Sequence, residues 1–113
     1  MYQCNLQEFY PTAFIRIGEN DQSMLKGSRF MSETSVHWLV ALDGHPKNGT
    51  EDLYVWNVLV YLADIHGNFE LSQPHFCTES YTCFDQACNT AKDLMISGLN
   101  DEMMKYTVRV RIS

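Results

Sequence analysis

The residues VHWLVALDGHPKNGTEDLYVWNVLVYLA, Val36–Ala63, determine the architecture that we expect for this chain. Apolar residues recur at every second position on both sides of its centre, which is the period of a β-strand. The centre, Gly44–Glu51, consists almost entirely of residues that favour turns. We therefore expect two strands joined as a long antiparallel hairpin. The second strand is apolar on both faces, so it should lie centrally in its sheet.

The flanking segments supply further elements. The alternation within Ala13–Ile17 predicts a short strand that ends in a turn at Gly18–Asp21. The segment Gln22–Ser35 is compatible with either an edge strand carrying a bulge or an ordered loop. After the hairpin, Phe69–Leu71 can pair back as a further strand before Pro74 ends it.

From Phe84 onward the apolar period changes to three and four residues, which is typical of an amphipathic helix. We expect this helix over about residues 82–98, with Thr82 as its N-cap and Asp85 in its first turn. The last residues, Tyr106–Ser113, alternate between apolar and polar or basic side chains and predict a final strand. The expected fold class is α+β, an antiparallel sheet of about four to six strands with one long helix packed on one face.

Length and composition favour one domain spanning residues 1–113, because 113 residues with 45% hydrophobic content are ordinary for a single core. No apolar run is long enough to cross a membrane. The first residues lack the pattern of a secretory signal, so we expect a cytoplasmic protein. In that compartment the four cysteines, Cys4, Cys77, Cys83 and Cys88, should be free thiols, mostly buried.

The net charge of −6 is unevenly distributed, because residues 48–91 contain no Lys or Arg. A negative surface repels phosphates, which argues against direct nucleic-acid binding and favours a basic protein partner. We expect the carboxylates of this span to form the partner-binding surface, at the hairpin turns and the start of the helix. These carboxylates are Glu51, Asp52, Asp64, Glu70, Glu79 and Asp85.

The sequence offers weak support for catalysis. His75, Cys77, Cys83 and Cys88 could in principle hold zinc, but they lack the paired short spacing of structural zinc sites. Nothing in the sequence aligns a histidine as base with a cysteine nucleophile, and no glycine-rich phosphate loop is present. Most of the aromatic residues fall on predicted apolar faces and are assigned to the core. We therefore expect no catalytic residue, no metal and no cofactor.

The leading hypothesis is a non-enzymatic acidic protein that inhibits a basic partner, either a nuclease or a nucleic-acid-binding complex. In size and charge the chain resembles phage-encoded anti-defence proteins, such as anti-CRISPR proteins, and the immunity proteins of nuclease toxins. Two alternatives stay open. One is a small Cys/His enzyme or metal-binding protein that uses His75–Cys88. The other is a homo-oligomeric structural or accessory module, for example a homodimer that pairs through the edge of Tyr106–Ser113.

Overall fold

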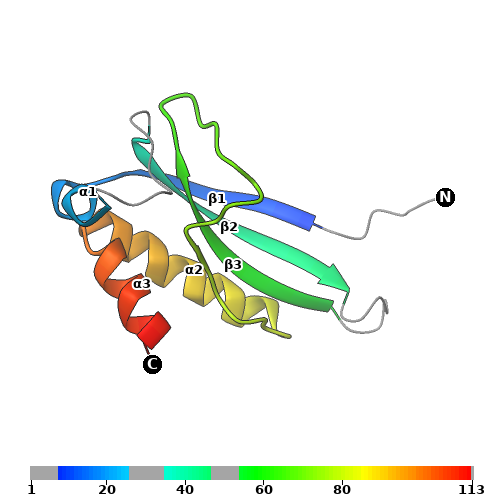
Figure 1. The fold of residues 1–113 in the computed structure, drawn as a ribbon. Helices are drawn as coiled ribbons and strands as arrows, with labels where there is room; N and C mark the ends of the chain where they lie inside the picture. The colour runs from blue at the N-terminus through cyan, green and yellow to red at the C-terminus, as the bar shows by residue number, and fades with distance from the viewer. Residues whose placement is uncertain (1–7, 26–34, 47–53, 113) are drawn as a thin grey trace.

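The predicted hairpin lies at the centre of the computed structural model, which describes residues 8–25, 35–46 and 54–112 (Figure 1). Strand β2 (His37–Pro46) pairs antiparallel with β3 (Tyr54–Ala63) along the whole length of both strands. Most residues of each strand are buried, because both faces of the hairpin are covered. The hairpin is therefore confirmed, and β3 lies inside the sheet as expected. The turn begins later than predicted, because Gly44, His45 and Pro46 still pair with β3.

Two further strands complete a four-stranded antiparallel sheet in the order β1-β2-β3-β4. Strand β1 (Glu8–Arg16) lies beside β2, and the short β4 (Phe76–Cys77) lies beside β3. Together with the helices this sheet confirms the α+β class and the expected sheet size.

A bulge in β1 determines which side of the sheet its side chains occupy. The pairing with β2 shifts between Pro11 and Ala13, and the hydroxyl of the extra residue, Thr12, donates a hydrogen bond of 2.7 Å to a β2 carbonyl. An inserted residue reverses the alternation of side chains between the two faces. Tyr10 and Ile15, which are an odd number of residues apart, therefore both face the side of the sheet that the helices cover.

Helix α2 (Phe84–Leu99) packs on one face of the sheet, which confirms the helix predicted over residues 82–98. Its buried side consists of small residues and one leucine, so the helix lies close to the sheet. A Cβ placed on Gly98 would lie 3.3 Å from side-chain atoms of both Ile15 and Met103. The core that it closes contains Ile15, Ile17, Leu25, Trp38, Val40, Leu42, Val58, Val60, Phe76, Ala87, Ala91, Leu94 and Met103.

A smaller apolar cluster lies on the opposite face of the sheet, which we call the outer face. Its buried members are Leu39, Leu59, Tyr61 and Ala63. Phe9 from β1 and Phe69 from the chain segment 64–75 pack against them. Figure 1 shows the helices together on the other side of the sheet.

Two shorter helices, α1 (Glu19–Leu25) and α3 (Met103–Ile112), cap each other. The first cap is supplied by Asp101, just before α3. Its carboxylate accepts hydrogen bonds from the backbone N–H groups of Asn20 at 2.7 Å and Asp21 at 2.8 Å. These are N–H groups of the first turn of α1, which have no partner within the helix itself.

The second cap is supplied by Asp21, which is fully buried. Its carboxylate accepts hydrogen bonds from the backbone N–H groups of Met103 at 3.0 Å and Met104 at 2.9 Å, at the start of α3. It also accepts one from the indole Nε1 of Trp38 in β2, at 3.3 Å. One buried carboxylate thus joins α1, α3 and the sheet.

The prediction of a final strand over Tyr106–Ser113 is wrong, because α3 continues to Ile112. The side chains of this segment alternate as they do in a strand. However, the buried carboxylate of Asp21 binds the N–H groups of Met103 and Met104 and thereby stabilises the first turn of a helix. Residue 113 lies outside the described residues. The proposed pairing of this segment with a second copy as a strand edge therefore loses its basis.

Three smaller predictions also need correction. The turn expected at Gly18–Asp21 is the beginning of α1, which extends to Leu25, and residues 26–34 lie outside the described part. Phe69–Leu71 is not a strand, and the chain pairs back later, at β4. The N-cap of α2 is Cys83, one residue after Thr82.

None of the helices in the described ranges is both long and apolar enough to cross a membrane.

Replacing Asp21 by alanine should destabilise the fold strongly. Asp21→Ala removes the acceptor for two backbone N–H groups and one indole N–H in a buried position, which should cost about 3 kcal/mol or more in the free energy of unfolding. Urea denaturation measures this loss. Asp93→Asn, at an exposed position of α2, is the control and should change stability by less than about 0.5 kcal/mol. Equal effects of the two variants would contradict the role assigned to Asp21.

Candidate functional site

The structure describes four of the six predicted acidic residues and places them in separate segments. Glu51 and Asp52 lie outside the described residues, in the connection between β2 and β3. Asp64 follows the last residue of β3, whereas Asp85 lies in the first turn of α2, beside the opposite end of that strand. Because a strand rises about 3.3 Å per residue, Asp64 is roughly 25 Å from the Trp56 end of β3.

Asp64 has a structural role in its own turn. Its carboxylate accepts hydrogen bonds from the backbone N–H groups of His66 at 2.8 Å and Asn68 at 2.9 Å, and from the side-chain amide of Asn68 at 3.2 Å. The backbone N–H of Asn68 is the largest cause that lowers the pKa of Asp64 from its ordinary value of 3.8.

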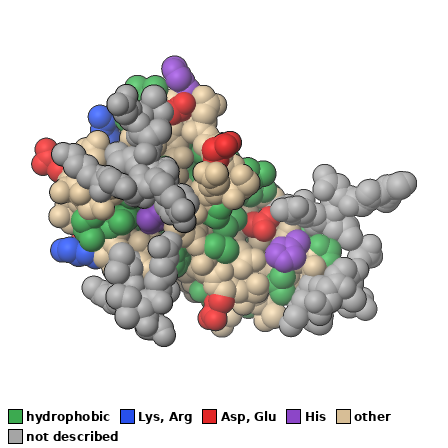
Figure 2. All heavy atoms as spheres, viewed as in Figure 1, with side chains coloured by type: hydrophobic (Ala, Val, Ile, Leu, Met, Phe, Trp, Pro, Cys, Tyr) green, Lys and Arg blue, Asp and Glu red, His purple; other side chains and the backbone are tan. Residues whose placement is uncertain are grey.

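The other described members of the set, Glu70, Glu79 and Asp85, are exposed. Glu70 lies in the segment after β3, and Glu79 lies between β4 and α2. On the face drawn in Figure 2, acidic side chains occur as separate patches with apolar side chains between them. A binding surface on this face would therefore contain apolar side chains as well as carboxylates.

An aromatic cluster, partly exposed, lies at the hairpin end of the sheet. We call Tyr10, Tyr54, Trp56 and Phe84 the hairpin-end cluster. The ring centroid of Trp56 lies 4.7 Å from that of Phe84, 5.3 Å from that of Tyr54 and 6.2 Å from that of Tyr10. Tyr10 and Phe84 remain 45% exposed. A groove of about 400 Å³ lies among Tyr10, Trp56, Phe84 and Leu42.

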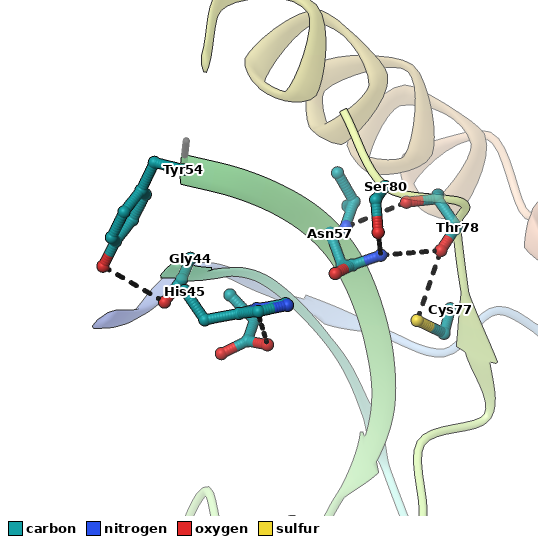
Figure 3. A network of polar contacts seen from close by, with 9 residues as sticks. Gly44, His45, Tyr54, Asn57, Cys77, Thr78 and Ser80 are labelled. Atoms are coloured by element: carbon teal, nitrogen blue, oxygen red, sulfur yellow. Dashed lines mark hydrogen bonds and ion pairs between the residues drawn. The ribbon is translucent and has the colours of Figure 1, made fainter. Parts of the chain in front are cut away.

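Backbone geometry fixes the central ring of this cluster. Trp56 exchanges two backbone hydrogen bonds of 2.7 Å with Tyr81, just before α2 begins. Across the hairpin it pairs with Gly44, and a Cβ on Gly44 would lie 2.5 Å from the Trp56 ring. The hydroxyl of Tyr54 donates to the carbonyl of Gly44 at 3.3 Å (Figure 3). The glycine therefore provides the space in which the indole lies.

Acidic residues are near neighbours of the hairpin-end cluster in the sequence. Asp85 follows Phe84 directly in the first turn of α2, and Glu79 lies two residues before Tyr81. Glu51 and Asp52 belong to the connection that joins Pro46 to Tyr54 at this end of the hairpin. The hairpin turn and the start of the helix are where the sequence predicted a binding surface.

Comparison of the chain with protein-family models, with curated proteins and with solved structures finds no match. Inference about function therefore depends on the geometry of the molecule.

The His75–Cys88 region is spread over different surroundings. His75 is buried, with its Nε2 3.4 Å from the hydroxyl of Thr107, whereas Cys77 and Cys83 are exposed free thiols. The expectation of buried thiols is thus wrong for these two cysteines, although Cys88 is partly buried against the core. Within the described ranges, no three His, Cys, Asp or Glu side chains are grouped so as to hold a metal ion.

The electrostatics of Cys77 also disfavour a nucleophile. Although the residue is exposed, partial desolvation of its sulfur raises the pKa of the thiol, and the negative charge of Asp43 raises it further. A raised pKa reduces the fraction of thiolate, which is the reactive form. The local environment therefore holds the proton on this sulfur at neutral pH.

The residues of the hairpin-end cluster were assigned to the core from the sequence. Their apolar periodicity is indistinguishable from that of core residues such as Val58. Two signals could have singled them out. Pro11 next to a threonine within a strand pattern indicates a bulge, and glycine in a strand interior indicates close approach of a neighbouring group, here at Gly44.

The substitution Gly44→Ala should displace the Trp56 ring. The added methyl group collides with the indole, so the ring must move, at a cost of about 1–3 kcal/mol in stability. The indole N–H signals in a two-dimensional NMR spectrum provide the measurement. The indole N–H signal of Trp56 should shift, whereas the indole N–H signal of Trp38, which donates a hydrogen bond to Asp21, should stay in place. An unchanged Trp56 signal would contradict the close packing described here.

Asp64 should titrate below its ordinary pKa of 3.8. Because the pKa is depressed in the folded state, its stabilising contribution is present above the unfolded value and is lost as the pH falls through the lower, folded value. A carboxyl-carbon NMR titration measures the midpoint. Asn68→Ala removes only the side-chain donor, so most of the depression should persist. A midpoint at or above 3.8 in the unmodified protein would contradict the turn geometry.

Proposed function

We propose that this chain is a non-enzymatic acidic binding protein that inhibits a basic partner, either a nuclease or a nucleic-acid-binding protein. The observation that carries the proposal is the hairpin-end cluster, in which a fixed Trp56 supports two rings that are each 45% exposed. Aromatic side chains of this kind are the usual anchors of protein interfaces, because they bury a large area at a low cost in side-chain entropy.

The charge of the chain supports a basic partner. A net charge of −6 attracts a positive surface and speeds the encounter with it. Asp85 follows Phe84 directly in α2, and Glu79 lies two residues before Tyr81, whose backbone pairs with Trp56. Glu51 and Asp52, which lie outside the described residues, stay a prediction. The binding surface that we propose does not include Asp64, one of the six carboxylates predicted from the sequence. Its carboxylate accepts hydrogen bonds within its own turn, at the far end of β3.

The combination of rings and carboxylates provides a way to block a nucleic-acid site. Proteins that bind single strands use aromatic rings to stack bases and cations to neutralise phosphates. A ligand that presents rings and carboxylates side by side competes for the same basic, partly apolar surface. Inhibition by occupation needs no catalytic group on the inhibitor.

We place this activity in the cytoplasm. The described cysteines, Cys77, Cys83 and Cys88, are free thiols, which persist in a reducing compartment.

Affinity capture from a native lysate, at about 50 mM and about 500 mM salt, tests the proposal. The immobilised protein should retain a basic nuclease or nucleic-acid-binding protein at low salt and release most of it at high salt. The retained partner should lose its nuclease or nucleic-acid-binding activity in the presence of the protein. Phe84→Ala and Asp85→Asn should each reduce retention, by about tenfold for the ring.

Matched control variants separate the cluster from the rest of the surface. Phe14→Ala removes an aromatic ring that is 50% exposed elsewhere on the sheet, and Asp93→Asn removes an exposed charge from the same helix as Asp85. Both should retain the partner as the unmodified protein does. The proposal is wrong if no basic partner is captured, if the partner stays fully active, or if the controls weaken retention as much as the cluster variants.

A further inference from the structure

A second groove lies on the outer face of the sheet, away from the helices and the hairpin-end cluster. It encloses about 620 Å³ between the sheet and the segment that follows β3. Among the described residues, its walls consist mainly of apolar and aromatic side chains, together with the carboxylate of Asp43. The lining residues are Phe9, Asp43, Leu59, Tyr61, Phe69, Leu71 and Pro74.

The aromatic side of this groove is held in place by packing and by one hydrogen bond. The ring centroid of Phe69 lies 4.8 Å from that of Tyr61 and 6.0 Å from that of Phe9. The hydroxyl of Tyr61 donates to the backbone carbonyl of Leu71 at 2.9 Å, which attaches the segment after β3 to the sheet. The groove is therefore built from three strands and a tethered loop.

Asp43 provides the charge. It lies on β2, directly opposite Phe9 of β1 and Asn57 of β3, and its side chain is 18% exposed. Desolvation is the largest cause that raises the pKa of the Tyr61 hydroxyl and of the Cys77 thiol, and the negative charge of Asp43 is the second. The charge of Asp43 therefore acts on groups at the groove. His45 Nδ1 lies 3.6 Å from the carboxylate and lies on the same strand.

We propose that the outer-face groove binds the side chain of a lysine from a basic polypeptide. Apolar walls suit the aliphatic stem of lysine, which buries its methylene groups while its charged end seeks a polar partner. The partly exposed ring of Phe69, which packs on the buried ring of Tyr61, attracts a cation, and Asp43 supplies the opposite charge. Glu70, exposed between two lining residues in the sequence, adds negative charge beside the groove.

This site is distinct from the hairpin-end cluster and does not depend on the function proposed for it. Phe9 and Tyr10 are consecutive residues of β1 and pair with Asp43 and Leu42, so they face opposite sides of the sheet. The edge strand β1 therefore contributes one aromatic residue to each site.

Titration with two small probes, followed by amide NMR shifts, tests the proposal. Nα-acetyl-lysine methylamide carries the ammonium group, and Nα-acetyl-norleucine methylamide has an apolar side chain of similar shape. The lysine probe should shift the signals of Phe9, Asp43 and Phe69 with an affinity about fivefold higher than that of the norleucine probe. Asp43→Asn should abolish this preference, whereas the control Asp93→Asn, at an exposed position of α2, should preserve it.

Phe69→Leu keeps the groove apolar and the carboxylate in place, so it should reduce only the part of the preference that comes from the aromatic face. A dispersed amide spectrum verifies that each variant is folded. The proposal is overturned if the two probes bind equally, if Asp43→Asn has no effect, or if the lysine probe shifts the Trp56 signals instead. Tighter binding of n-butylammonium than of the lysine probe would assign the groove to a free amine and also overturn it.

Discussion

The difference in length between the hairpin and the helix that covers it constrains the whole molecule. Strands β2 and β3 have ten residues each, so the hairpin is roughly 33 Å long. Helix α2 has 16 residues and is roughly 24 Å long. Helix α2 is therefore too short to cover the whole face of the sheet on which it packs, and its first residue, Phe84, lies beside Trp56. Tyr10 and Phe84 lie where this cover ends, and this explains why core-like aromatic residues are half exposed there.

At the opposite end of the sheet, helices α1 and α3 are held together by two carboxylates, each of which caps the other helix. Asp101 caps α1 and Asp21 caps α3, although they are far apart in the sequence. Because Asp21 also accepts a hydrogen bond from Trp38, the helices are anchored to the sheet at the end away from the hairpin-end cluster. The carboxylate caps that stabilise the fold therefore lie at the opposite end of the molecule from the hairpin-end cluster. For this reason we expect Phe84→Ala to change partner binding without changing the fold.

Local periodicity was sufficient to predict the hairpin and α2, because each buries a regular apolar face along its own length. It failed for Tyr106–Ser113, whose alternation is that of a strand, because the helical start at Met103 depends on a carboxylate more than 80 positions away. The start of α1 was missed for the same reason, since its cap is Asp101. The predicted binding surface stays a prediction, and the hairpin-end cluster adds aromatic residues that the sequence analysis had assigned to the core. Neither the proximity of Trp56 to the start of α2 nor the bulge that brings Tyr10 beside Trp56 could be derived from the sequence, because both depend on pairing between separate segments.

The central claim is that a basic partner contacts the hairpin-end cluster and its neighbouring carboxylates. Oxidative footprinting of the aromatic side chains, with the captured partner bound and absent, tests this claim most directly. Binding should protect Tyr10, Trp56 and Phe84 from oxidation and leave Phe14 as reactive as in the free protein. Protection of Phe14 with unchanged reactivity of Tyr10 and Phe84 would place the partner elsewhere and contradict the claim.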